Sequence, residues 1–325
     1  MRTALLSILL VLLALPAYAG EIAVLGGYGW TDKPTEKTYA WQTQYMEGLG
    51  DHIAYSLSYV NQGHFIEHHR DGYAGNLWAR TNLIDKRLSL GAGVGALYYF
   101  DTIKPAAGSN APERDYHGWG TTVNLAATWY TESRLFYQLQ GYYVRGDKSF
   151  NTLTALAGIG YQLDAPPVQG PDVKGTHQPY RTTDNELTLM GGETIVNIAG
   201  PGKSVSAALE YRRGIWRYLE VSAGALYEGK SNLINRYGIT TQVWLAKRFL
   251  DDNMSLGAGF GPYFAIDERH GGSPSPRSMF VSKIASISGS LALSQHVDLR
   301  ATFDRVITTY DRDSDIFMGG IGYRF

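Results

Sequence analysis

The stretch LSLGAGVGALYYFD, residues 88–101, returns as MSLGAGFGPYFAID, residues 254–267, 166 positions later in the chain. In both copies large apolar residues alternate with glycine or serine, which is the period of two expected for a β-strand. A helix would scatter these glycines around its surface. The second copy puts on one face Met254, Leu256, Ala258, Phe260, Pro262 and Phe264, and on the other Ser255, Gly257, Gly259, Gly261 and Tyr263.

Segments with the same alternation follow one another along the chain, about eight before Leu163 and about eight after Glu186. Each is close to the roughly ten residues of a tilted strand that crosses a bilayer. Short turns such as residues 84–87 alternate with longer polar segments, of which residues 102–117 are the longest. Short periplasmic turns, long outer loops and an even number of strands are typical of outer-membrane barrels. The predicted fold class is therefore all-β, a transmembrane antiparallel β-barrel.

A secreted β-sandwich or a soluble barrel would also have alternating strands, but its apolar face would point inward. Here the face expected to point outward is aromatic and aliphatic, while the other face carries Ser, Thr, Asn, Gln and Gly. The strands are also too many for one sandwich core to bury. The composition agrees, with 38 glycines, 13% aromatic residues and only 18% charged residues. We expect the protein to lie in the bacterial outer membrane.

Residues 1–19 have the layout of a cleaved secretory signal, with Arg2, an apolar run over residues 4–15 and small residues at 17–19. The apolar run has roughly 12 residues, whereas a helical span needs roughly 20. We therefore expect the mature chain to begin at Gly20 and to contain no helical membrane span.

The sequence also narrows the classes of partner and cofactor. It has no cysteine, so it forms no disulfides and offers no lipid-anchor site. The net charge of -1 gives no electrostatic reason to expect a nucleic-acid partner. The glycine runs lack the following helix and the Lys-Ser or Lys-Thr pair of a phosphate-binding loop, so we expect no cofactor.

The two halves of the chain correspond at a spacing of 165 or 166 residues, for example Trp78 with Trp244. This spacing predicts a tandem duplication of a unit of about 145 residues. We expect residues 20–163 to form the first barrel unit and residues 186–325 the second. Residues 164–185 hold four prolines and are expected to be a periplasmic linker.

Each unit resembles the small eight-stranded outer-membrane barrels in size, strand count and Gly-aromatic final strand. That group includes the OmpA-type and OmpX-type barrels and a lipid A deacylase. The final stretch IFMGGIGYRF, ending at Phe325, resembles the carboxy-terminal strand signature of outer-membrane barrels. The resemblance implies recognition by the outer-membrane assembly machinery through Phe325. We expect outer-membrane lipid and lipopolysaccharide as further partners, and no residue pattern names an extracellular or periplasmic one.

Two architectures agree with these units: two tandem eight-stranded barrels, or one sixteen-stranded barrel. An eight-stranded lumen is just filled by side chains, whereas sixteen strands leave an aqueous channel. In the first unit tiny inward residues face large ones across the sheet, as a narrow lumen requires. In the second unit inward charges of both signs must pair, because an unpartnered buried charge is very costly. These charges are Glu210, Arg212, Glu220, Arg248, Asp298, Arg300 and Asp304. We favour two filled barrels.

The most polar cluster is HFIEHHRD, residues 64–71, expected in an outer loop of the first unit. The neighbouring loop, residues 102–117, could bring further imidazoles and carboxylates to the same place and form a divalent-metal site. The candidate ligands are His64, His68, His69, Asp115 and His117. The second unit has GKSNLINR instead, so such a site would belong to one barrel.

The resemblance to a lipid A deacylase implies His and Ser on the penultimate strand of a unit. The corresponding segments, LFYQLQGYYVRG and VDLRATFDRVITT, contain no histidine, so no catalytic residue is assigned. The sequence favours an integral outer-membrane protein with a structural, envelope-interaction or surface-recognition role. The alternatives are a sixteen-stranded diffusion pore for small hydrophilic solutes and a lipid-modifying enzyme.

Overall fold

A computed structural model describes residues 20–31, 35–104, 114–147, 149–163, 170–171, 183–197, 202–268 and 278–325. Within these ranges no helix is long and apolar enough to cross a membrane. The predicted signal segment, residues 1–19, and most of the predicted linker, residues 164–185, lie outside the described residues.

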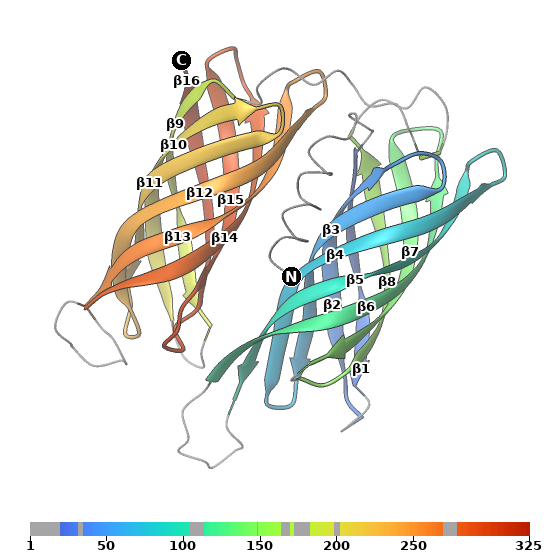
Figure 1. The fold of residues 1–325 in the computed structure, drawn as a ribbon, viewed down its shortest axis with the longest axis horizontal. Helices are drawn as coiled ribbons and strands as arrows, with labels where there is room; N and C mark the ends of the chain where they lie inside the picture. The colour runs from blue at the N-terminus through green and yellow to red at the C-terminus, as the bar shows by residue number, and fades with distance from the viewer. Residues whose placement is uncertain are drawn as a thin grey trace. The chain divides into compact units, whose positions relative to one another are not determined.

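The first barrel has eight antiparallel strands in chain order, and β8 pairs with β1 to close the sheet (Figure 1). On β1, Leu25 lies opposite Gln42 of β2 and Gly158 of β8, so this strand is paired on both sides. The strands are β1 (Gly20–Thr31), β2 (Lys37–Gly48), β3 (Ile53–Phe65), β4 (His68–Leu83), β5 (Leu88–Ile103), β6 (Arg114–Tyr130), β7 (Leu135–Gly146) and β8 (Thr152–Gln162).

The second barrel repeats this arrangement, and β16 pairs with β9 to close it. On β9, Leu189 lies opposite Leu209 of β10 and Ile321 of β16. The strands are β9 (Asn185–Val196), β10 (Lys203–Trp216), β11 (Leu219–Lys230), β12 (Asn235–Phe249), β13 (Met254–Asp267), β14 (Ser278–Ala292), β15 (Val297–Ile307) and β16 (Ser314–Arg324).

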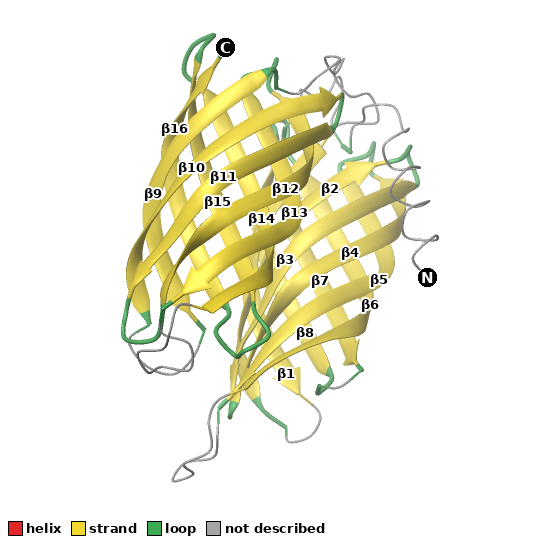
Figure 2. Ribbon diagram, turned by 60° about the vertical axis from the view of Figure 1, so that its left-hand side comes forward, coloured by secondary structure: helices red, strands yellow, loops and turns green. Residues whose placement is uncertain are grey.

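The two closures confirm the prediction of two tandem eight-stranded barrels. The alternative of one sixteen-stranded barrel is wrong, because β8 is paired with β7 and β1 while β9 is paired with β10 and β16. Each sheet therefore satisfies its backbone groups within itself, as a protein in lipid must. In Figure 2 the described residues are strands joined by short connections.

The alternation seen in the sequence places apolar side chains on the outer walls and polar ones in the lumens. Val94 on β5 and Phe260 on β13 are 60% and 55% exposed, whereas the next residues on these strands, Gly95 and Gly261, point inward. The predicted outer face of the final strand is confirmed, since Phe317, Ile321 and Tyr323 are all exposed. An apolar exterior around a polar interior is the pattern of barrels that cross outer membranes.

Residues 64–71 form a hairpin, and the prediction of an outer loop is wrong for them. β3 continues to Phe65 and β4 begins at His68, with a turn at Ile66 and Glu67. Likewise, β5 runs to Ile103 and β6 begins at Arg114, inside the predicted loop of residues 102–117. Cross-strand pairing can continue above the apolar band because polar residues are compatible with strand pairing in water.

A glycine bulge bends β3 and β11 at equivalent places. Gly63 has a φ of 78° and Gly229 a φ of 91°, values that side-chain-bearing residues rarely adopt. The pairing with the next strand shifts at both places. A Cβ at Gly63 would also collide with the backbone oxygen of Tyr39, and one at Gly229 with that of Val205. The repeated glycines thus set the same strand geometry in both barrels.

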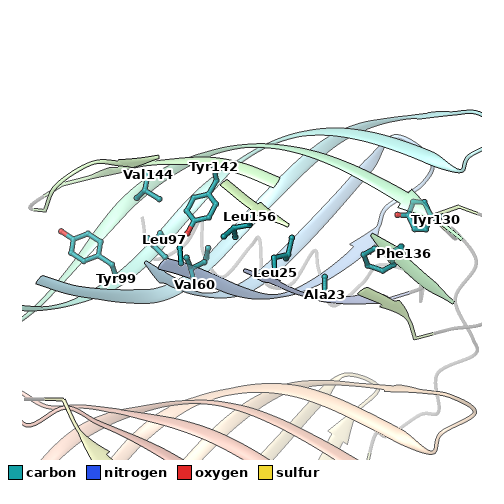
Figure 3. Close-up of a cluster of buried hydrophobic side chains, with 12 residues drawn as sticks. Ala23, Leu25, Val60, Leu97, Tyr99, Tyr130, Phe136, Tyr142, Val144 and Leu156 are labelled. Carbon is teal, nitrogen blue, oxygen red and sulfur yellow. The ribbon is translucent and has the colours of Figure 1, made fainter. Parts of the chain in front are cut away.

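The lumen of the first barrel is filled by side chains that reach across it (Figure 3). Tyr142 of β7 extends toward Val60 and Leu97, on the opposite part of the wall. Near the inner end, where the chain enters and leaves the barrel, the rings of Tyr130 and Phe136 pack with centroids 5.5 Å apart. This filling agrees with the narrow interior expected for eight strands.

The glycine runs make room for one tryptophan in each lumen. A Cβ at Gly93 would lie 2.7 Å from the Trp78 ring, and a Cβ at Gly259 would lie 2.5 Å from the Trp244 ring. Both rings are buried, and each indole nitrogen donates a 2.9 Å hydrogen bond, to Ser56 in the first barrel and to Ser222 in the second.

We predict that Gly259→Val destabilises the protein by about 1–3 kcal/mol, because the buried Trp244 ring must move. Ala258→Val is the matched control, since Ala258 lies on the exposed outer face of the same strand. The free energy of urea unfolding in lipid vesicles measures both. Equal stability of the two variants would contradict the close packing of Gly259 against the indole.

We also predict that residues 20–163 and residues 185–325, made as separate chains, each form a barrel. The reason is that each sheet closes on itself and leaves no unpaired edge in lipid. Heat-modifiable gel migration and protease resistance in detergent measure folding. Folding of the intact chain alone, with both halves degraded, would show that the two sheets depend on each other.

Candidate functional site at the outer ends of the barrels

The candidate ligands predicted from the sequence all lie at the outer end of the first barrel. Successive residues of a strand point to opposite faces, so the histidines of the β3–β4 hairpin point to both faces of the barrel wall. His64 and His69 are paired across the hairpin on the outside of the barrel. His68 points into the lumen, where it meets Asp101 of β5.

His64 and His69 form a parallel stack, with ring centroids 4.2 Å apart and an angle of 6° between the planes. The Tyr39 hydroxyl lies 2.8 Å from His64 Nδ1. The Asn61 amide donates to His69 Nε2 at 3.3 Å. These bonds hold both imidazoles in fixed orientations on the outer wall.

His68 belongs to a different cluster, at the mouth of the lumen. Its Nδ1 lies 3.0 Å from Asp101 Oδ1, and the Ser149 hydroxyl donates to Asp101 Oδ2 at 2.8 Å. In a serine hydrolase the hydroxyl binds the other nitrogen of the histidine, which removes its proton. Here the serine binds the carboxylate, so the cluster ties the β7–β8 connection to β4 and β5 and does not have the order of a catalytic triad.

Asp115 and His117 lie on the outside of β6. Thr102 Oγ1 donates to Asp115 Oδ1 at 2.9 Å, and His117 packs edge-on against Phe100 with centroids 5.5 Å apart. Among the residues that the structure describes, no group of three or more His, Cys, Asp or Glu side chains is placed to hold a metal ion. The metal site stays a prediction, with its candidate ligands distributed over two faces of the wall.

A fully buried arginine, Arg70 of β4, closes the outer end of the first lumen. Its Nε donates to Gln62 of β3, and its Nη2 donates to Thr152 of β8 at 3.0 Å. Its Nη1 donates to Ser149 and to the Phe150 carbonyl, and the guanidinium lies 4.1 Å from the Phe150 ring centroid. One side chain therefore joins three strands and the last outer connection of this barrel.

The second barrel has the corresponding arginine, Arg236 of β12, which is also fully buried. It forms a two-pronged ion pair with Glu228 of β11, and Nη2 donates to Ser314 of β16 at 2.7 Å. Its Nη1 donates to the Tyr310 hydroxyl, which in turn donates to Asp267 at 3.1 Å. Burial raises the pKa of Tyr310, which lies in the β15–β16 connection, so this phenol stays protonated and remains a donor.

Alternation alone does not single out these two arginines, although the repeat spacing could have found them. Arg70 and Arg236 are 166 residues apart, as are Gln62 and Glu228, and Asp101 and Asp267. The shared interval marks a set of polar residues that the strand pattern places inside the lumen. Closure of the outer mouth by arginine is therefore a property of both units.

Between the tryptophan and the arginine layers the first barrel uses neutral amides. Gln138 donates to Gln44 and Gln140, and Gln140 donates to Asn124, which donates to Asn76. These bonds run from β7 to β2 on one side and through β6 to β4 on the other. A connected amide network satisfies buried polar groups without any net charge.

The second barrel uses ion pairs in its lumen, and of the inward charges predicted to pair they include Glu210, Arg212, Glu220, Asp298 and Arg300. Arg212 contacts Glu210 at 2.8 Å and Glu220 at 3.5 Å, with its guanidinium 3.7 Å from the Trp244 centroid. Other pairs are Arg300 with Glu186 and Arg324 with Asp298, both at 2.8 Å. Asp304 and Glu210 line a cavity of about 20 Å³, room for about one water molecule.

Two closed sheets with apolar outer walls and filled polar interiors define an integral outer-membrane β-barrel protein of bacteria. The interiors leave no wide channel through the layers just described. The surfaces available for interaction are then the outer ends and the outer walls of the barrels.

No protein-family model matches this sequence, and no curated protein matches it. Among solved structures, the chain is similar to the N-terminal β-barrel domain of Pseudomonas aeruginosa OprF, at 14% identity and a TM-score of 0.36, over 45% of this chain and 98% of that one. It is also similar to Neisserial surface protein A, at 7% identity and a TM-score of 0.36, over 45% of this chain and 96% of that one. The translocator domain of the autotransporter NalP from Neisseria meningitidis is 12% identical, with a TM-score of 0.24, over 100% of this chain and 94% of that one.

We predict that Arg236→Met destabilises the protein by about 3–5 kcal/mol, because it leaves the Glu228 carboxylate buried without its guanidinium. Arg70→Met is the matched control, since its partner Gln62 is neutral, and it should cost less. Adding Glu228→Gln to Arg236→Met should restore part of the loss. Urea unfolding in vesicles measures all three, and equal losses for the two single variants would contradict the role of the ion pair.

Proposed function

We propose that this protein is a non-conducting envelope component that acts through the outer surfaces of its barrels, in a structural, envelope-interaction or surface-recognition role. The observation that supports this proposal best is the filling of both lumens. Each has a buried tryptophan in the middle and a buried arginine at the outer end. Side chains that span the lumen and bond to the opposite wall leave no path for hydrated solutes.

In this proposal the polar side chains inside the lumens have a structural role. In the first barrel they are linked amides, and in the second they are ion pairs with short distances. Polar side chains that already bind one another across a lumen stabilise the packing that fills it. They bind passing solutes poorly. This favours the envelope role over the diffusion pore.

The expected partners follow from the apolar outer walls and from the exposed position of Phe325. We propose that outer-membrane lipid and lipopolysaccharide surround the apolar walls and that the assembly machinery recognises Phe325. In support, Phe325 is 61% exposed and stacks beside Tyr323, with centroids 6.3 Å apart on the outer face of the final strand. The exposed position leaves this side chain accessible at the inner end of the second barrel.

We further infer that the two barrels arose by tandem duplication and that residues 1–19 are a signal segment. The duplication is supported by side chains with equivalent contacts at a constant interval. Trp78 with Ser56 and Trp244 with Ser222 form the same 2.9 Å hydrogen bond 166 residues apart. Equivalent contacts at equal spacing are more specific than a shared strand pattern.

We predict that the refolded mature protein gives no stable conductance steps in planar bilayers. The reason is that ions would have to displace Arg70 and Trp78 in one barrel, or Arg236 and Trp244 in the other. A conducting porin in the same bilayers is the positive control for insertion and recording. Long-lived steps on the nanosiemens scale would refute the non-conducting role.

A further inference from the structure

The two barrels differ on the outside, at the level where the apolar wall of the first barrel ends. Strand pairing defines equivalent rows in the two barrels, because each row joins residues that lie directly opposite one another on neighbouring strands. In the first barrel one such row is Asn61, Asp71, Phe100 and His117, on β3 to β6. The equivalent row of the second barrel is Tyr227, Tyr237, Ile266 and Met279. The same place in the fold is thus polar in one barrel and apolar in the other.

We define the outer wall patch as this row of the first barrel together with the rows directly below and above it. The row below is Tyr59, Tyr73, Tyr98 and Trp119, and the row above is His64, His69, Thr102 and Asp115. In the second barrel the row below is Ala225, Ile239, Phe264 and Val281. The row above is polar in the second barrel too, since it begins with Lys230 opposite Asn235, so the two barrels differ in the two lower rows.

The rings of the patch, together with Trp41 of β2 beside it, are in contact with one another. Tyr59 contacts Trp41 and Tyr73, with centroid distances of 5.3 and 5.6 Å. Tyr73 continues to Phe100 at 6.0 Å, and Tyr98 continues to Trp119 at 5.0 Å. Trp41 and Trp119 remain 37% and 55% exposed. Exposed ring faces in a fixed arrangement suit stacking against a flat, partly apolar ligand such as a sugar ring.

A buried carboxylate fixes this surface. The Tyr59 hydroxyl donates to Asp71 Oδ2 at 2.5 Å, and Asp71 is only 3% exposed although it lies on the outside of the wall. A carboxylate on a lipid-facing wall is unfavourable. The fold does not require it, since the equivalent residue of the second barrel is Tyr237. Because Asp71 is buried, it acts on the surface through Tyr59, whose hydroxyl it holds.

Cations lie beside the patch, toward the outer end. Lys104 follows the end of β5, two residues beyond Thr102 and on the same face, and it is exposed. Lys37 begins β2, with its ammonium 4.0 Å from the Tyr28 ring centroid. Ammonium and guanidinium groups form strong hydrogen bonds to phosphate. The order toward the outer end is therefore apolar wall, rings, imidazoles, then positive charge.

We propose that the outer wall patch binds the phosphorylated saccharide headgroup of an outer-leaflet glycolipid. Acyl chains would lie along the apolar wall below, the sugar would stack on the rings and bond to His64 and His69, and a phosphate would meet Lys104. This inference rests on the proposed envelope role, whose own test is conductance. A glycolipid fits better than a protein partner, because the patch lies on the side of the barrel at the membrane surface.

The test uses the full mature chain refolded in a zwitterionic detergent, with lipid A as the probe and cardiolipin as the comparison. Both lipids carry phosphates and several acyl chains, but cardiolipin has no sugar. We expect lipid A to bind about tenfold more tightly than cardiolipin. The double variant His64→Ala/His69→Ala and the single variant Tyr98→Leu should remove most of this difference. Heat-modifiable migration confirms that each variant is folded.

Phe264→Leu is the matched control, because Phe264 occupies in the second barrel the position of Tyr98 in the first. It should leave the preference for lipid A unchanged. Equal binding of lipid A and cardiolipin by the unmodified chain would overturn the proposal, since only phosphate and acyl chains would then be recognised. Equal losses in Tyr98→Leu and Phe264→Leu would overturn it too. Neither result would alter the conductance expected of filled lumens.

Discussion

The hydrogen bonds that join β8 to β1 and β16 to β9 are the constraint on which both barrels depend. In a bilayer an open edge strand leaves backbone groups without partners, so each set of eight strands must close on itself. Closure with so few strands makes the interior narrow, and the interior must then be filled. The glycines beside Trp78 and Trp244 follow from this, because a bulky indole fits only where the facing wall has no side chain.

The two lumens meet the same requirement with different chemistry. Gln62 and Glu228 occupy equivalent positions beside Arg70 and Arg236, so one arginine is held by neutral groups and the other by an ion pair. Deeper in the barrels the contrast continues, with amide networks in the first and Arg212 between two glutamates in the second. Both lumens are therefore filled, the first mainly through neutral amides and the second mainly through ion pairs.

Most of the fold could be predicted from the sequence, but little of the candidate site could, and the reason is physical. Alternation, turn spacing and the 166-residue interval predict strands, faces and two units, because these features depend on the periodicity of neighbouring residues. Whether the His68 side chain points into the lumen or outward depends on where the hairpin turns. A run of polar residues does not show whether it forms a loop or a pair of strands. The partners of Arg70 come from β3, β8 and the last connection, which only the closed barrel brings together.

Because one chain contains two equivalent barrels, each barrel is a control for interpreting the surface of the other. Where both barrels keep a residue, as with the tryptophan, serine and glycine of the lumen, packing in a narrow closed sheet is a sufficient explanation. Where the second barrel has Tyr237 and Met279 but the first has Asp71 and His117, the needs of the sheet cannot be the reason, since both sheets close equally well. The proposed glycolipid site would account for this difference, because Asp71 holds the Tyr59 hydroxyl and His117 packs beside Phe100 on the outer wall.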